Sequence, residues 1–173
     1  SHRPEAINRT VYDIVDGTGV QAFITPSTVM GAATPSISIG YTNSASTVGR
    51  ATPATLPIGN TAAAVTSVVY SGTGAGKFGP FIPLQAGDAG IKSVQSISMS
   101  ASYVSGVLNL VLCRPLLTLP ITTLGVTAER DLINQLNSGP RVYDGACLSW
   151  LMLAGAATPV ASPLSGHLEF GWT

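Results

Sequence analysis

The clearest pattern along the chain lies between residues 91 and 103, where serine occupies every second position from 96 to 102. Five apolar residues share the other face of this segment: Ile91, Ile97, Met99, Ala101 and Tyr103. A repeat of two residues is typical of a β-strand that buries one face. Ser105 and Gly106 then predict a turn. Residues 107–114 predict a largely buried return strand that ends before Pro115.

The N-terminal third of the chain is patterned differently. In residues 10–25, two β-rich runs flank Asp16-Gly17-Thr18-Gly19, which predicts a hairpin because Asp-Gly tolerates the positive φ of a tight turn. Of the 38 residues from 26 to 63, 27 are Ser, Thr, Ala, Gly or Pro. Only three residues there alternate as in a strand: Ile37, Ile39 and Tyr41. We therefore expect a loop-rich arm with one short strand, suited to lying along a neighbouring molecule.

One helix is expected, near residues 127–137. Thr127 can cap its N-terminus, and Glu129 and Asp131 place negative charge in its first turn. An apolar stripe follows, formed by Leu132, Ile133 and Leu136. The Asn-Ser-Gly-Pro segment at 137–140 ends the helix.

Further strands are predicted near residues 65–70, 146–154 and 164–172, without the strand–helix alternation of α/β folds. The expected fold is therefore all-β and mainly antiparallel, a β-sandwich or jelly-roll-like domain with one short helix. Residues 1–63 are expected to form an N-terminal hairpin and a small-residue-rich arm. Residues 64–173 are expected to form the β-sandwich core domain.

Charge is scarce in this chain and changes the functional expectation. Only 9% of residues are charged and the formal net charge is zero, whereas about 25% is usual. Without a basic stripe, binding to nucleic acid is not expected. No apolar run reaches the roughly 20 residues of a membrane span, so no membrane partner is expected either. Because permanent interfaces are depleted in Lys, Glu and Asp, the composition favours a subunit of a larger assembly. A single domain with a Ser/Thr-rich surface is the alternative.

A glycine-rich stretch at 71–78, SGTGAGKF, is the strongest candidate for chemistry. It supplies the Gly76-Lys77 pair of a phosphate-binding loop. However, Ser71 stands where the first glycine belongs, and Phe78 stands where the magnesium-binding hydroxyl belongs. Pro80 follows closely and prevents the helix whose N-terminus would hold phosphate. We expect a flexible connection between strands and no nucleotide cofactor.

Other candidate motifs are also incomplete. In Asp16-Gly17-Thr18-Gly19, a glycine separates the Asp-Thr pair that an aspartic protease loop needs. His167 and Glu169 match half of a zinc deaminase signature, but the cysteines it requires downstream are missing. There is no G-x-S-x-G elbow, and His2 and His167 are the only histidines, which leaves a hydrolase as a minor alternative. We expect no enzyme, and no catalytic, cofactor-binding or metal-binding residues.

The cysteines and the large aromatic residues are expected to be structural. Cys113 and Cys147 lie in predicted strands as buried free thiols, and they can pair only if those strands are neighbours. Four aromatic residues are expected in the core, with a sugar-stacking platform as the alternative. They are Tyr143, Trp150, Phe170 and Trp172.

Three stretches carry a resemblance to known proteins: FIPLQAGDAGIKSVQSI at 81–97, ERDLINQLNSGPRVYDGACLSWL at 129–151 and SPLSGHLEFGW at 162–172. Together they resemble a group of small virion structural proteins of tailed bacteriophages. This resemblance covers a little over half of the chain and implies a structural role in the particle. It implies no site residues and does not distinguish the capsid face, a vertex or the tail.

We therefore expect a non-enzymatic structural subunit of a phage particle, located in the virion. Its expected form is a capsid decoration or cement protein that contacts copies of itself and other virion proteins as a homo-oligomer. The alternative is a tail or baseplate β-module that binds a host surface glycan.

Overall fold

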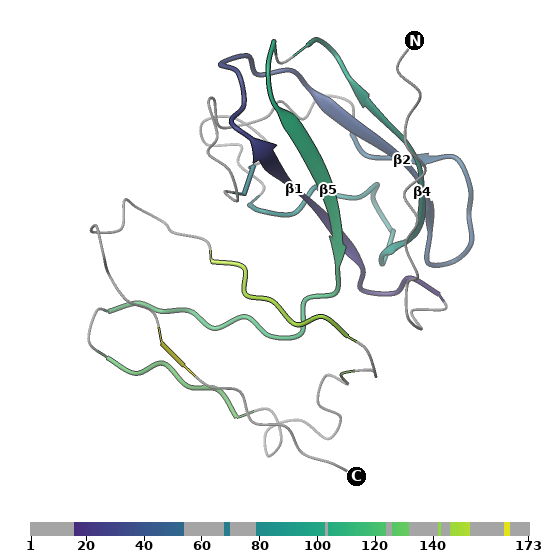
Figure 1. Cartoon of the computed structure of the whole chain (residues 1–173). Helices are drawn as coiled ribbons and strands as arrows, with labels where there is room; N and C mark the ends of the chain where they lie inside the picture. The colour runs from purple at the N-terminus through teal and green to yellow at the C-terminus, as the bar shows by residue number, and fades with distance from the viewer. Residues whose placement is uncertain are drawn as a thin grey trace. The chain divides into compact units, whose positions relative to one another are not determined.

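The structure, a computed structural model, describes residues 16–53, 68–69, 79–102, 104–123, 126–131, 142, 146–152 and 165–166. Contacts between residues divide the chain into two compact units, Ser1–Pro115 and Leu116–Thr173. All the strands that the structure describes belong to the first unit (Figure 1). The boundary expected between residues 63 and 64 falls inside this unit, because strands from both sides of it pair with each other.

One sheet of the first unit has three antiparallel strands, with β2 (Ile37–Asn43) in the centre. β3 (Arg50–Ala51) lies on one side of β2 and β4 (Ile91–Met99) on the other. The alternation at Ile37, Ile39 and Tyr41 is confirmed as a strand, and all three side chains are buried. A segment expected as the one strand of a peripheral arm is therefore the central strand of a sheet.

The second sheet pairs β1 (Gln21–Thr28) with β5 (Val107–Cys113). β1 alternates between buried and half-buried side chains over its first six residues, as expected for a strand with one core face. Its other edge is partly covered, because Val69 N–H donates to the Ile24 carbonyl and Ile82 N–H donates to the Ala22 carbonyl. The expected return strand thus exists as β5, but it pairs with β1 rather than with β4.

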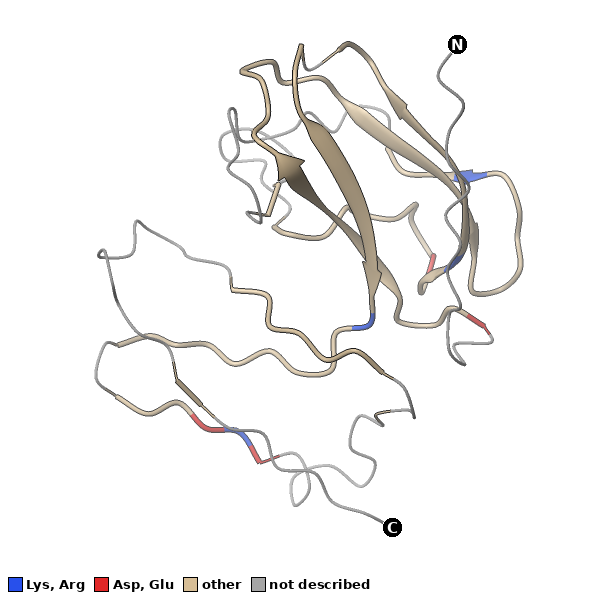
Figure 2. Cartoon of the chain, viewed as in Figure 1, with Lys and Arg blue, Asp and Glu red and all other residues tan. Residues whose placement is uncertain are grey.

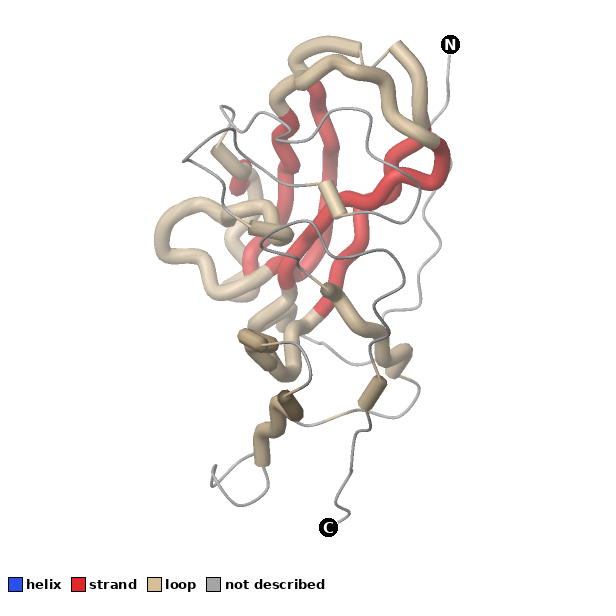
Figure 3. The backbone as a smooth tube through the Cα atoms, turned by 90° about the vertical axis from the view of Figure 1, so that its left-hand side faces the viewer, coloured by secondary structure: helices blue, strands red, loops and turns tan. Residues whose placement is uncertain are grey.

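Both sheets contribute to one hydrophobic core. Figure 3 shows the strands of the two sheets in red, turned by 90° from Figure 1. Ala22 and Ile24 of β1 and Ile39 and Tyr41 of β2 belong to it, and Ile91 joins from the start of β4. β5 is half-buried rather than largely buried as expected, because only alternate leucines pack against this core. The described chain is all-β with antiparallel sheets, and no helix in it is long and apolar enough to cross a membrane.

The apolar residues of β4 share one face as predicted, but that face is not buried along its length: Ile91 is buried, whereas Ile97 and Met99 are about half exposed. Two irregularities keep these residues on one face. The pairing with β2 shifts between Gly40 and Tyr41 and again between Thr42 and Asn43, so β4 carries two additional residues. Each bulge turns the following side chains to the opposite face. Because the two bulges cancel, Ile91 and Ile97 lie on the same face of the sheet. Val94 lies on that face too, although its spacing of three residues from each of them breaks the two-residue repeat.

The turn predicted at 16–19 is confirmed. The carboxylate of Asp16 accepts hydrogen bonds from the backbone N–H of Thr18 at 2.9 Å and from its hydroxyl at 2.8 Å. Gly17 has a φ of 76° and lies against the backbone of Ile91 and Lys92, where a Cβ has no room. The strand expected before this turn lies outside the described residues.

The helix expected near residues 127–137 is not seen in the second unit. Residues 127–131 are not helical, and Thr127 and Glu129 are not buried in a packed face. An isolated helix shorter than about 12 to 15 residues is marginal in water unless an apolar face packs against something. The side chains expected to form that face, at 132–136, lie outside the described residues.

The strand expected over 146–154 is also not seen where the structure describes it. Residues 146–152 are not assigned to a strand and their side chains are exposed. A strand needs the backbone groups of a neighbour, and no described segment of the second unit pairs with this one. Apart from residues 165–166, the strand expected over 164–172 lies outside the described residues.

Candidate functional site

The most elaborate polar arrangement in the described chain is centred on Asp88, and we call it the Asp88 cluster. The Asp88 side chain is only 2% exposed and its carboxylate accepts three hydrogen bonds. The donors are the Tyr41 hydroxyl at 2.6 Å, the Asn43 amide at 2.7 Å and the Arg50 guanidinium at 2.9 Å. Asp88 and Arg50 form the ion pair of the cluster.

The members of the Asp88 cluster come from three segments that are distant in sequence. Tyr41 and Asn43 lie on β2, Arg50 lies on β3, and Asp88 lies in the loop before β4. Secondary bonds strengthen the same connection. The Tyr41 hydroxyl accepts from Gln85 N–H at 2.9 Å, and Arg50 donates to the Ala86 carbonyl at 3.3 Å. The cluster thus fastens the loop at 85–90 to the β2–β3 hairpin.

The electrostatics of the Asp88 cluster favour a fixed charge. The hydrogen bond from Arg50 lowers the pKa of Asp88 to about 2, and the bonds from Tyr41 and Asn43 act in the same direction against burial. Burial raises the pKa of Tyr41, and its hydrogen bond to Asp88 adds to that rise. A carboxylate with both oxygens engaged and so low a pKa is poorly matched to proton transfer near neutral pH. This geometry suits holding a loop in place.

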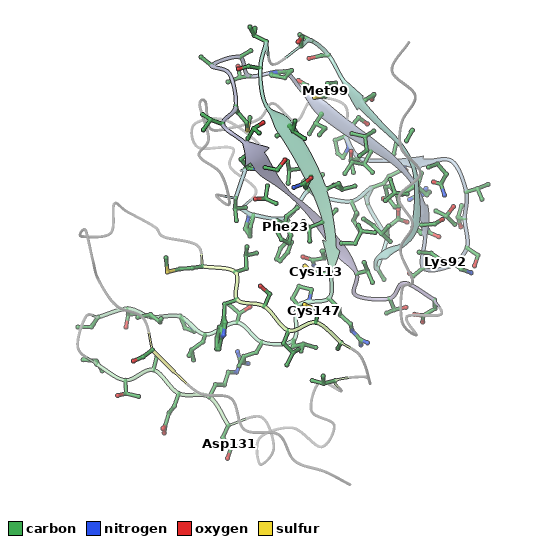
Figure 4. The ribbon with its side chains drawn as sticks, viewed as in Figure 1. Phe23, Lys92, Met99, Cys113, Asp131 and Cys147 are labelled. Carbon is green, nitrogen blue, oxygen red and sulfur yellow. The ribbon has the colours of Figure 1, made fainter. Side chains whose placement is uncertain are left out.

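The first unit also carries an apolar groove of about 320 Å³. Its walls include Ile24 and Ile37 from the core face, Ile97 and Met99 from β4, and alternate leucines of β5. The lining contains no charged side chain. Figure 4 shows Met99 and Lys92 at opposite ends of β4, with the groove at the Met99 end. Such a surface favours an uncharged, apolar occupant.

The second unit has a separate hollow of about 550 Å³ lined by segments around residues 119–123 and 126–130. Arg130 borders it and donates to the Thr118 carbonyl at 3.0 Å. Its lining combines three threonines and four apolar residues with one carboxylate, Glu129, and one guanidinium, Arg130.

The residues singled out from the sequence are not brought together by the described structure. The segments 71–78 and 167–169 lie outside the described residues. Cys113 and Cys147 are free thiols. Cys113 is half-buried, and burial raises the pKa of its thiol, which lowers its reactivity near neutral pH. Cys147 is exposed, contrary to expectation, because the segment that carries it is not part of a packed strand.

Trp150 is 66% exposed rather than part of the core as expected. It lies in the apolar run at 146–152, which has no described partner strand to cover it. The other aromatic residues of that set, Tyr143, Phe170 and Trp172, lie outside the described residues. Sequence patterns missed the Asp88 cluster, since Arg50 and Asp88 lie 38 positions apart in the sequence and leave no spacing signal.

Within the described ranges, no group of three or more His, Cys, Asp or Glu side chains is placed to hold a metal ion. Comparison of the chain with protein-family models, with curated proteins and with solved structures found no match.

Proposed function

We propose that this chain is a non-enzymatic structural subunit of a tailed-phage particle, a decoration or cement protein that stabilises the capsid shell. One observation carries the proposal: large apolar side chains are exposed on both units although charge is scarce. Those on the first unit are Val29, Val48, Ile97, Met99, Val104 and Val107, and those on the second unit are Ile121, Val126, Leu148, Trp150, Leu151 and Met152.

Burial of these side chains supplies the energy that the proposal needs. Removing apolar surface from water contributes about 25 cal/mol per Å². Few charges have to be desolvated in return, because the two sheets carry almost no charged residues. Figure 2 shows this as sheets that are almost entirely tan. A charged surface of the same size would lose part of this gain to desolvation. The described surface therefore favours stable contacts between subunits.

The rest of the first unit supports the same role. A subunit that binds by surface contact loses less entropy when the surface is already rigid. The Asp88 cluster fixes the loop at 85–90, and the shared core fixes both sheets. In this proposal the chain acts through buried interface area, with its own copies and other virion proteins as partners.

The test is to locate the chain in intact particles. Particles purified from the source that encodes the chain are analysed by mass spectrometry and by reconstruction, and the isolated chain is sedimented at micromolar concentration. We expect a stable oligomer and a regular position on the shell. A monomer that is absent from particles would contradict the proposal.

One observation favours a second function, a tail or baseplate β-module that binds a host glycan. An exposed Trp150 offers an aromatic face of the kind that stacks on sugar rings. For this function, Trp150→Ala is expected to abolish binding on a glycan array, whereas Met152→Ala is the matched control. Met152 is 62% exposed in the same segment but has no ring. Equal binding by both variants would exclude Trp150 as the sugar contact.

A further inference from the structure

Between residues 96 and 100, β4 has an edge that no described residue covers, whereas Ile91 at the start of β4 donates its N–H to the Val20 carbonyl. The hydrogen bonds of β2 show which backbone groups of residues 96–100 point to this edge. Thr52 forms hydrogen bonds with both backbone groups of Ile39. The Thr52 hydroxyl accepts from the Ile39 N–H, and the Thr52 N–H donates to the Ile39 carbonyl. Ile39 therefore bonds away from β4. Its partner Ile97 must then point its own N–H and carbonyl away from β2.

The same phase holds along the regular part of β4. Ser100 N–H donates to the Ser36 carbonyl at 2.9 Å, so the even-numbered positions from 96 to 100 face β2. Met99, like Ile97, presents its backbone groups outward. By contrast, the outer edge of β1 is partly occupied by Val69 and Ile82. Among the described residues, the N–H and carbonyl groups of Ile97 and Met99 therefore have no hydrogen-bond partner.

Between residues 96 and 100, the side chains of this edge lack the usual protection against strand pairing. Lys92 and the two bulges provide such protection only nearer the start of β4. Natural edge strands carry Lys, Pro or inward-pointing charges that prevent pairing with another chain. No charged residue occurs between Lys92 and Arg114. Ile97 and Met99 are 46% and 48% exposed at the mouth of the apolar groove, while exposed serines occupy the opposite face.

We propose that this edge pairs with β4 of a second copy, antiparallel, about a twofold axis at Ser98. The segment at 96–100 reads Ser-Ile-Ser-Met-Ser, the same order of polar and apolar types in both directions. Ile97 of one copy then lies opposite Met99 of the other, and the two Ser98 residues face each other. Two three-stranded sheets become one continuous sheet. A contact of this kind is isologous, the commonest arrangement in oligomers.

The register follows from the bulges and the end of the strand. An axis at Ile97 would place Met99 opposite Gln95, at the bulge. An axis at Met99 would place Ile97 opposite Ala101, beyond the end of β4. Only the axis at Ser98 engages all four outward groups within the regular segment and covers both apolar side chains. This inference rests on the proposed function, in which copies of the chain associate, and it identifies the β4 edge as the surface through which they do so.

A disulfide scan of the full chain tests this register. At the twofold axis the two Ser98 residues form a non-hydrogen-bonded pair, with Cα atoms about 4.5 Å apart. That separation lies within the roughly 4.4–6.8 Å that disulfides span. Ser98→Cys should therefore give a disulfide-linked dimer under mild oxidation. Its mass spectrum should contain a peptide pair joined through position 98 of both copies.

Ser96→Cys is the matched control, because it lies on the same exposed face but opposite Ser100 of the other copy. Its two copies would be separated by four residues, about 13 Å, which is too far for a disulfide. The control should stay at the level of the wild type, which shares the free thiols of Cys113 and Cys147. Equal cross-linking of both variants, or of neither, would overturn the register.

Ile97→Pro provides an independent readout. The Ile97 N–H points away from β2, so proline at this edge position removes a donor to the partner without breaking the β2–β4 ladder. The variant should keep its β-type circular dichroism and sediment as a smaller species than the wild type. Unchanged sedimentation would overturn the β4 interface.

The outcomes also separate this inference from the proposed function. An oligomer that binds particles but forms no disulfide in the Ser98→Cys variant would contradict the proposed β4 interface and still support the proposed function. A disulfide-linked dimer of the Ser98→Cys variant that is absent from particles would support the proposed β4 interface and contradict the proposed function.

Discussion

Asp88 is the residue on which the loop before β4 depends. Its carboxylate joins β2, β3 and that loop, and its three donors are themselves held by the sheet. Removing the charge leaves the Arg50 guanidinium without its carboxylate partner and takes the negative charge from the oxygen that accepts from the Tyr41 hydroxyl. A buried polar group that loses its partner costs more than the net value of the bond.

This arrangement predicts an acid-dependent stability. The pKa of Asp88 is lowered to about 2, below the value of about 3.9 for Asp in an unfolded chain. Its contribution is therefore complete above the unfolded-state pKa and disappears as the pH falls through about 2. Asp88→Asn should lower the urea midpoint near pH 5, and the difference from the wild type should shrink towards pH 2.

Asp16→Asn is the control for that experiment. The pKa of Asp16 is also lowered, chiefly by the backbone N–H of Thr18, but the residue is exposed and its bonds are local. Its substitution should change the midpoint less at every pH. A pH-independent difference between the wild type and Asp88→Asn would contradict the role given to this carboxylate.

At the scale of elements, the sequence predicted β2 and β4 from their alternation, β5 from an apolar run that ends before Pro115, and the turn at 16–19 from Asp-Gly. The pairing of these strands was not predictable, because a two-residue repeat shows which face is buried and not which strand lies beside it. β4 and β5 follow each other in sequence yet belong to different sheets. The prediction of a helix near residues 127–137 is wrong for residues 127–131, the part that the structure describes. Local propensity alone does not stabilise so short a helix.

The pair Ile39 and Ile97 tests this view of the central sheet. They face each other across β2 and β4, but Ile39 is fully buried and Ile97 is 46% exposed. Ile39→Ala should lower the free energy of unfolding by about 2–5 kcal/mol, the usual cost of a cavity in a packed core. Ile97→Ala should cost clearly less in urea unfolding at a concentration where the chain is monomeric. Equal losses would mean that the β4 edge is covered within one chain.

For the whole molecule, the scarcity of charge supports the proposal of an assembly subunit, whereas no sequence motif led to the Asp88 cluster. The Asp88 cluster brings together residues that no spacing rule connects, so a candidate site of this kind emerges only from the fold. A protein that acts through surface contact also needs no characteristic residue spacing. Its partners have to be found from exposed apolar side chains and free strand edges.

The division into two units predicts which part of the chain folds alone. Every described strand and every residue of the hydrophobic core cluster lies before residue 116. A fragment of residues 1–115 should therefore keep β-type circular dichroism and a cooperative urea transition. A fragment of residues 1–63, which ends at the boundary expected from the sequence, lacks β4 and β5 and should show no such transition. If residues 1–115 unfold without cooperativity while the full chain unfolds cooperatively, the second unit is required for the core, and the two sheets depend on contacts that cross the division.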